Sequence, residues 1–138
     1  MTQRSIVRVR DVMEDHFVMA DGINTVTEGV AALSKAGAHT LFIRKRSEDD
    51  EFGIVVLRDI AREVLAVDKS PDRINLYEIM TKPVLAIDPN MDIRYCARLF
   101  MRFGLSTAPV VESGEIIGVV TYNEMVLRSL LAERSAQD

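Results

Sequence analysis

Asp59 and Thr121 are two side chains whose types and predicted positions would allow them to take part in binding chemistry. Asp59 stands near the start of a predicted helix, where a carboxylate can accept hydrogen bonds from two neighbouring hydroxyl groups. Thr121 stands at the end of a predicted strand, where its hydroxyl can donate to a phosphate oxygen, and helix N-terminal amides add their own attraction for an anion. Each residue also has an ordinary structural explanation, because Asp often starts helices and Thr favours strands.

Residue sets that would indicate catalysis or metal binding are not evident. His16 has no second His or Cys at ligand spacing. Cys96 falls on the apolar stripe of a predicted helix, so a buried and inert thiol is expected. No Ser, His and Asp set and no glycine-rich phosphate loop occurs at useful spacing. We therefore expect no enzymatic activity, no bound metal and no cofactor.

The two binding candidates lie in a duplicated unit. The segment 9–13, Val-Arg-Asp-Val-Met, returns as the segment 76–80, Leu-Tyr-Glu-Ile-Met, at an offset of 67 residues (80 − 13). The offset falls to 65 residues (118 − 53) at Gly53 and Gly118, so the first copy has a loop longer by two residues (67 − 65). An indel confined to a turn is typical of diverged repeats.

Each copy predicts the order strand, helix, strand, strand, helix. The first helix of copy one has a capping-box pattern at Thr25 and Glu28, and Asp92 is the expected N-cap in copy two. A glycine suited to the left-handed conformation, Gly37 or Gly104, ends each of these helices. The predicted strands are 17–20, 40–45 and 52–57, then 84–87, 108–111 and 116–122; the predicted helices are 25–37, 58–67, 92–104 and 123–134.

The expected fold is α/β, with two β-α-β-β-α repeats packed about a pseudo-twofold axis. A single repeat would leave one face of its small sheet exposed, whereas two repeats bury that face. The expected divisions are repeat 1 at 5–67, a linker at 68–74, repeat 2 at 75–132 and a tail at 133–138. Pro71 supports the linker because proline disfavours helix at the preceding residue.

Composition limits the possible functions. The chain has 138 residues, 48% of them hydrophobic, and a net charge of −4, which gives no electrostatic case for nucleic acid. Its apolar stretches are shorter than the ~18 residues that a membrane span needs. The N-terminus lacks an apolar signal region, and one cysteine cannot form an intramolecular disulfide. We expect a cytoplasmic protein.

From about Ser5 to about Leu131, the chain resembles a tandem pair of CBS domains, also called a Bateman module. The resemblance is carried by the segment 106–111, Ser-Thr-Ala-Pro-Val-Val, and the segment 118–124, Gly-Val-Val-Thr-Tyr-Asn-Glu, together with the order and duplication of the elements. It implies an adenosine-containing ligand between the repeats, such as AMP, ADP, ATP, S-adenosylmethionine or NAD(H). It also implies nucleotide-binding roles for Asp59, Arg58, Thr121, Glu124, Asn123, His39, Thr40, Ser106, Thr107, Thr81, Phe17, Val84, Ile54 and Val119.

Neither copy matches the family's pattern of glycine, hydrophobic, any, Thr or Ser, two of any, then Asp. Copy one keeps Asp59 but has Val56 in place of the hydroxyl residue, while copy two keeps Thr121 but has Glu124 in place of Asp. Arg58 can partly replace the lost donor by meeting a phosphate. If one site is occupied, we favour the one that contains Asp59.

Two functional hypotheses follow. The first is a ligand-sensing module that signals to an unknown regulated protein through a change in packing or in the geometry of a homodimer. The helix faces 93–103 and 125–131 carry more apolar residues than one stripe needs, which favours such a dimer. The second is a structural or interaction module that binds no nucleotide and retains only relics of the motifs.

Overall fold

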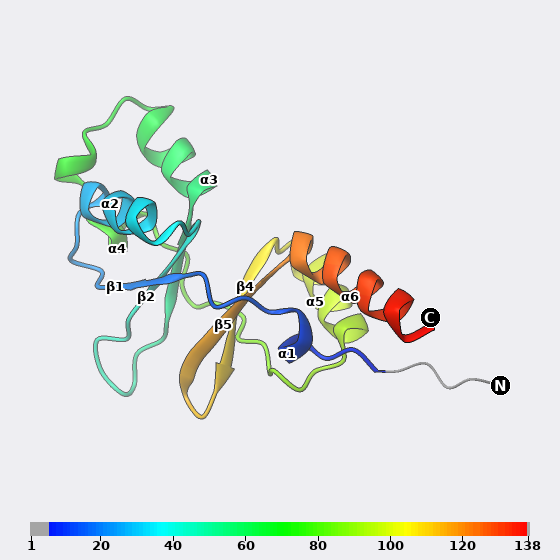
Figure 1. Ribbon diagram of the computed structural model, residues 1–138. Coiled ribbons are helices and arrows are strands. Elements are labelled where there is room, and N and C mark those ends of the chain that lie inside the picture. Colours follow the sequence, from blue (N-terminus) through cyan, green and yellow to red (C-terminus); the bar gives the residue numbers. More distant parts are fainter. Residues whose placement is uncertain (1–5, 138) are drawn as a thin grey trace. The chain divides into compact units, whose positions relative to one another are not determined.

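The computed structural model describes residues 6–137, with side chains described up to residue 131. The chain forms two compact units (Figure 1). The central unit is His16–Val84. The terminal unit combines the described residues before His16 with those from Leu85 onward. The compact units thus cut across the two sequence repeats. The mixed α/β class that the sequence predicts is confirmed.

The central unit is a three-stranded sheet with helices packed against it. The strand order is β1-β2-β3, in which β1 pairs with β2 in parallel and β2 pairs with β3 antiparallel. Leu41, Val55 and Leu76 are fully buried in its core. Its elements are β1 (Val18–Ala20), α2 (Val26–Ala36), β2 (Thr40–Ile43), β3 (Gly53–Val56), α3 (Leu57–Ile60), a π-helix (Ala61–Leu65), a 3-10 helix (Pro71–Arg73) and α4 (Leu76–Ile79).

The ends of α2 follow from local chemistry. The Thr25 hydroxyl accepts a hydrogen bond from the Glu28 amide at 3.1 Å, and the Glu28 carboxylate accepts one from the Thr25 amide at 2.9 Å. At the other end Gly37 has φ 64°, the left-handed conformation that glycine adopts without a steric penalty. The predicted capping box and the predicted C-terminal glycine are both confirmed.

The terminal unit combines a β-hairpin with two long helices. Its elements are α1 (Val9–Val12), α5 (Ile93–Phe103), β4 (Thr107–Glu112), β5 (Glu115–Thr121) and α6 (Tyr122–Gln137). Asp92 is the N-cap of α5, as expected, and accepts from the Arg94 amide at 2.9 Å. Figure 1 shows α5 and α6 side by side, and their contact encloses a core that includes Val12, Phe100 and Val120.

The predicted strand at 84–87 is wrong. This segment makes a single parallel bridge, between Ile87 and Val110, in which the Ile87 amide donates to the Pro109 carbonyl and the Val111 amide donates to the Ile87 carbonyl, both at 2.9 Å. To continue the ladder back toward Leu85, residue 109 would have to donate a hydrogen bond. Proline has no N–H, so the pairing stops there. Phe42, the counterpart of Pro109 in copy one, has its N–H, and β1 there is a true strand.

The opening segment of each repeat completes the sheet of the other repeat. In the central unit the amides of Ile54 and Thr81 donate to each other's carbonyls, at 3.0 and 2.9 Å. In the terminal unit Glu14 and Val119 form the same pair, at 2.9 and 2.8 Å. The two copies have therefore exchanged their openings within one chain.

Two equivalent glycines make room for the exchanged segments. A Cβ on Gly53 would lie 2.6 Å from the Met80 sulfur, and a Cβ on Gly118 would lie 2.7 Å from the Met13 sulfur and 3.1 Å from the Glu14 carbonyl oxygen. Contacts below 3.0 Å require neighbouring atoms to move. The glycine that begins β3 and the glycine inside β5 thus allow the methionine of the other copy to pack against the sheet.

We expect Gly118→Ala to destabilise the protein by about 1–3 kcal/mol, since overpacking displaces Met13 and presses on the Glu14 backbone. Urea unfolding of Gly118→Ala, Met13→Ala and the double variant measures this cost. Because Met13→Ala removes the obstructing sulfur, the double variant should lose less stability than the two single losses combined. Additive losses would show that Gly118 is not needed for this contact.

Candidate functional site

The carboxylate of Asp59 holds the start of α3 and is 7% exposed. Its Oδ2 accepts a hydrogen bond from the Val56 amide at 2.9 Å, and its Oδ1 accepts one from Arg62 Nη2 at 3.0 Å. A carboxylate offers about four lone-pair positions, so two further donors can still be accommodated. The structural role proposed for Asp59 is therefore real, and it leaves capacity for a pair of ligand hydroxyls.

Thr40 supplies a hydroxyl beside the position where Val56 lacks one. The two residues are direct partners in the antiparallel β2–β3 pair, and side chains of such partners lie on the same face of the sheet. Thr40 begins β2, while Val56 ends β3, immediately before the helix that carries Asp59. The central unit thus brings Thr40 and Asp59 to one end of its sheet.

A row of predicted site residues continues across this sheet. Phe17 packs edge-to-face on Phe42 with their ring centroids 5.4 Å apart. Phe42 is the β2 partner of Ile54, and Ile54 pairs in turn with Thr81. The structure therefore places Ile54 and Thr81 next to each other across the sheet, with the Phe17 ring packed on Phe42 at the other end of this row.

The remaining candidates of the central unit are more peripheral. Arg58 follows the first residue of α3 and is exposed, as is His39, which immediately precedes Thr40. Val84 is half-buried, three residues beyond Thr81. All eight candidates with numbers below 85 belong to this one unit: Phe17, His39, Thr40, Ile54, Arg58, Asp59, Thr81 and Val84.

The terminal unit presents a different arrangement at the equivalent position. Thr121 Oγ accepts a hydrogen bond from the Glu124 amide at 3.3 Å, so the hydroxyl rather than the acid caps this helix. The Glu124 carboxylate pairs instead with Arg128 Nε, one turn further along α6. Glu124, whose side chain is one methylene longer than that of Asp, pairs within its own helix and does not hold the helix start as Asp59 does in α3.

Arg128 connects the site at Thr121 and Glu124 to the opening segment of repeat 1, which pairs with β5. Its guanidinium donates to Glu14 Oε1 at 2.7 Å and to the Met13 carbonyl at 3.2 Å. Sequence reasoning missed both Arg128 and Arg62, which pair with the equivalent acids Glu124 and Asp59. The spacing of an acid with an arginine three or four residues later, as in Asp59 with Arg62 and Glu124 with Arg128, would have indicated them.

The other terminal candidates gather at one end of the hairpin. Thr107 and Thr121 are direct partners in the β4–β5 pair, and the Ser106 carbonyl accepts from the Tyr122 amide at 3.2 Å. Asn123 is exposed at the start of α6. Val119 is buried within β5. This unit therefore has two facing hydroxyls where the central unit has Thr40 and Val56.

The described residues contain neither an exposed cysteine nor a cluster of metal ligands. Cys96 is fully buried, and burial raises the pKa of its thiol to about 11, so the thiolate is disfavoured. Among the side chains that the structure describes, up to residue 131, no three His, Cys, Asp or Glu residues gather to hold a metal ion. No helix within residues 6–137 is long and apolar enough to cross a membrane.

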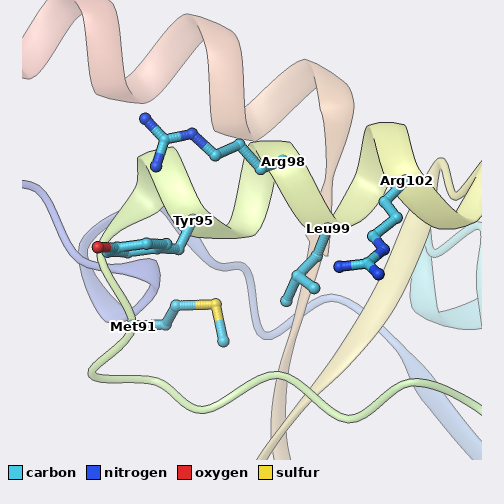
Figure 2. Close-up of a pocket in the computed structure, with 5 residues that line it drawn as sticks. All are labelled: Met91, Tyr95, Arg98, Leu99 and Arg102. Carbon is cyan, nitrogen blue, oxygen red and sulfur yellow. The ribbon is translucent and has the colours of Figure 1, made fainter.

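A separate apolar groove runs along the outer side of α5 (Figure 2). Tyr95, Leu99 and Arg102 project from the helix toward Met91, and the Arg98 guanidinium lies 5.3 Å from the centre of the Tyr95 ring. The neighbouring α6 exposes four further apolar side chains: Val126, Leu127, Leu130 and Leu131. Both helix faces that the sequence singled out therefore present exposed apolar surface.

Comparisons with known proteins agree with this geometry. The family model of the CBS domain matches residues 76–130. An uncharacterized protein from Methanopyrus kandleri is 25% identical over 121 residues, which are 87% of this chain and 61% of the relative. The L-aspartate semialdehyde sulfurtransferase of Methanosarcina acetivorans is 28% identical over 137 residues, but this chain spans a quarter of its length (25%).

Solved structures extend the match to the whole fold. The hexameric CBS-CP12 protein from bloom-forming cyanobacteria superposes with a TM-score of 0.87 at 28% identity, covering 93% of this chain and 74% of that one. A CBS domain pair solved with 5′-methylthioadenosine and S-adenosyl-L-methionine has a TM-score of 0.72 at 25% identity, covering 91% of this chain and 99% of that one. The chain therefore contains a CBS domain at residues 76–130, and the superpositions show the fold of a CBS domain pair over nearly all of its length.

Proposed function

We propose that this chain is a regulatory module that binds an adenosine-containing ligand at a half-site of its central unit, formed by the residues around Asp59 and Thr40. The observation that carries the proposal is the buried carboxylate of Asp59, which caps α3 and retains acceptor capacity for two hydroxyls. A similar CBS domain pair binds 5′-methylthioadenosine and S-adenosyl-L-methionine, which share an adenosine group. The ribose of adenosine offers the paired hydroxyls that such a carboxylate accepts.

The charges around Asp59 favour a phosphorylated ligand. Arg62 already donates to its carboxylate, and Arg58, the residue before Asp59 in α3, supplies a second guanidinium. Guanidinium groups bind phosphate oxygens by charge-assisted hydrogen bonds. We therefore rank AMP, ADP, ATP and NADH above the cationic S-adenosylmethionine. Thr40 is the hydroxyl donor of this half-site.

Signalling is proposed to pass through association of the module with a second copy. The exposed apolar side chains of α5 and α6 form a surface of the kind that pairs in oligomers. A similar protein, the cyanobacterial CBS-CP12 protein, is hexameric. Sedimentation velocity over a range of concentrations, with and without ligand, measures both the association and its response to the ligand.

Isothermal titration calorimetry with AMP, ADP, ATP, NADH and S-adenosylmethionine tests the binding proposal. We expect heat with at least one phosphorylated compound and a stoichiometry of one per chain. Protein should first be unfolded and refolded, so that any ligand retained from the cell is removed. Absence of heat with all five compounds would contradict the proposal.

The alternative is a structural module without a nucleotide. It is favoured by the terminal unit, where Thr121 is used as a helix cap and Glu124 is paired with Arg128. Under this alternative, titration gives no heat while the association through α5 and α6 persists. The two measurements together therefore separate the alternatives.

A further inference from the structure

The central unit contains a cavity of about 590 Å³, distinct from the groove on α5, at the end of the sheet where β2 turns toward β3. Its walls come from three places in the chain: the turn after β1, with Gly22 and Ile23; the end of β2 and its hairpin, 43–46 with Asp50; and the segment of α4 and its continuation, with Tyr77, Met80 and Lys82. None of the residues proposed to bind adenosine lines it. Its volume is within the range of small-molecule sites.

Positive charge dominates this cavity, although the chain as a whole is acidic. Four cationic side chains line it, Arg44, Lys45, Arg46 and Lys82, against two carboxylates, Asp21 and Asp50. The lining therefore carries a net charge of +2 (4 − 2) in a chain of net charge −4. Of the acidic run 48–51, only Asp50 contributes to the walls, so the hairpin presents its cations to the cavity without most of its acids.

The two carboxylates hold cations in position. Asp21 Oδ1 lies 3.2 Å from Arg44 Nη1, and Asp50 pairs with Lys82 while its Oδ2 accepts from the Arg46 amide at 2.8 Å. Two hydrogen bonds hold the pKa of Asp50 well below its usual range. The one from Lys82 has the larger effect, and the one from the Arg46 amide has the next largest. Asp50 therefore stays ionised and anchors the hairpin to the segment after α4.

Lys45 and Arg46 supply the charge that the carboxylates do not balance. Lys45 Nζ lies 4.8 Å from the centre of the Phe52 ring, and the Arg46 Nε is 3.5 Å from Asp50, a longer ion pair than its neighbours. Both side chains are exposed at the cavity. Their two charges match those of a phosphate monoester, which carries close to two negative charges at neutral pH.

The cavity also has an apolar side. Ile43 is 2% exposed and Met80 is half-buried, whereas Tyr77 is 54% exposed and so presents its ring to solvent. Gly22 permits this arrangement: its carbonyl accepts from the Tyr77 amide at 3.0 Å, and a Cβ on Gly22 would lie 3.2 Å from the Tyr77 Cβ. A ligand with an aromatic ring would cover that ring against Tyr77, while a phosphate group on the same ligand meets Lys45 and Arg46.

We propose that this cavity binds a small phosphorylated molecule that carries an aromatic ring, at a site separate from the one around Asp59. The proposal does not depend on adenosine binding. The ligand enters with its ring beside Tyr77 and Met80 and its phosphate toward the hairpin. The hairpin then joins the segment after α4 through the ligand as well as through Asp50 and Lys82.

Phenyl phosphate is the probe, and amide chemical shifts of the ¹⁵N-labelled protein are the measurement. We expect saturable shifts at Gly22, the segment 44–46 and Lys82, with weaker binding of inorganic phosphate and of phenol. The Lys45→Ala/Arg46→Ala variant should bind phenyl phosphate about tenfold more weakly or worse, since two charge-assisted hydrogen bonds are lost. Both side chains are exposed, so the fold should be retained.

Two controls distinguish the site from general charge attraction and from the Asp59 half-site. Lys35→Ala/Arg73→Ala removes the same charge from exposed positions of the central unit outside the cavity and should leave the affinity unchanged. Asp59→Ala should also leave it unchanged. Equal affinity in Lys45→Ala/Arg46→Ala, equal weakening in the Lys35 and Arg73 control, or loss in Asp59→Ala would each overturn the proposal.

Discussion

Asp59→Ala is expected to weaken binding of a phosphorylated adenosine ligand by about 1–3 kcal/mol, or roughly five- to 150-fold. The reason is that the Asp59 carboxylate is the acceptor proposed for both ribose hydroxyls, and alanine leaves those hydroxyls without a partner. Calorimetric titration of the wild type and the variant with the same nucleotide measures the change. Unchanged affinity would show that the assignment of Asp59 is wrong.

The same substitution also removes a helix cap, so a matched control is needed. Asp11 holds the corresponding position in α1, where its Oδ2 accepts from the Arg8 amide at 2.9 Å. Asp59→Ala and Asp11→Ala each remove the acid that accepts from the N-cap amide, so each should lose stability by about 1–3 kcal/mol, the value of a hydrogen bond to a charged group. Only Asp59→Ala should lose affinity, which separates the binding role from the capping role.

Phe100→Ala is expected to have the largest effect on folding, a loss of about 3–5 kcal/mol. Phe100 is fully buried in the core of the terminal unit and packs edge-to-face on Tyr122, with ring centroids 5.5 Å apart. Such a loss is a large part of the ~5–15 kcal/mol that stabilises most domains. Urea unfolding followed by circular dichroism measures it.

The single cysteine reports which unit unfolds. Cys96 lies in the same core as Phe100, so its reaction with a thiol reagent requires the terminal unit to open. We expect Phe100→Ala to make Cys96 react much faster in the absence of urea. Phe103→Ala is the matched control on the same helix, since Phe103 is 56% exposed, and should cost less than ~1 kcal/mol. Equal losses in the two variants would contradict the burial of Phe100 and the exposure of Phe103.

Local chemistry explains what the sequence could predict. Thr25 with Glu28, and the glycines at 37 and 104, act within one turn of their own helix, so their roles need no knowledge of the fold. The role of Asp59 at the start of α3 was predictable for the same reason. The second helix of copy one is interrupted by a π-helix, in which the Ala66 amide donates to the Ala61 carbonyl at 2.8 Å. No local pattern indicated that interruption.

Features that depend on distant partners were not predictable. The strand expected at 84–87 fails because of a missing N–H on Pro109, a residue of another strand. The pairing of Thr81 with Ile54 was also hidden, since the two opening segments are so alike that either could join either sheet. Thr40 was recognised by resemblance alone, and its place opposite Val56 follows from the register of β2 and β3. The contact of Lys82 with Asp50 joins residues that are far apart in the sequence.

The exchanged opening segments limit how the gene of such a protein can be divided or recombined. A gene fragment that encodes one repeat alone would produce a sheet whose edge at Ile54 or Val119 has lost its hydrogen-bonding partner, with a cleft beside Gly53 or Gly118 where a methionine belongs. Recombination that swaps one repeat for a foreign copy would keep the fold only if the new opening fitted the old sheet. The indivisible unit of evolution is therefore the pair, and the shared methionine-glycine contacts are the places where its two halves must change together.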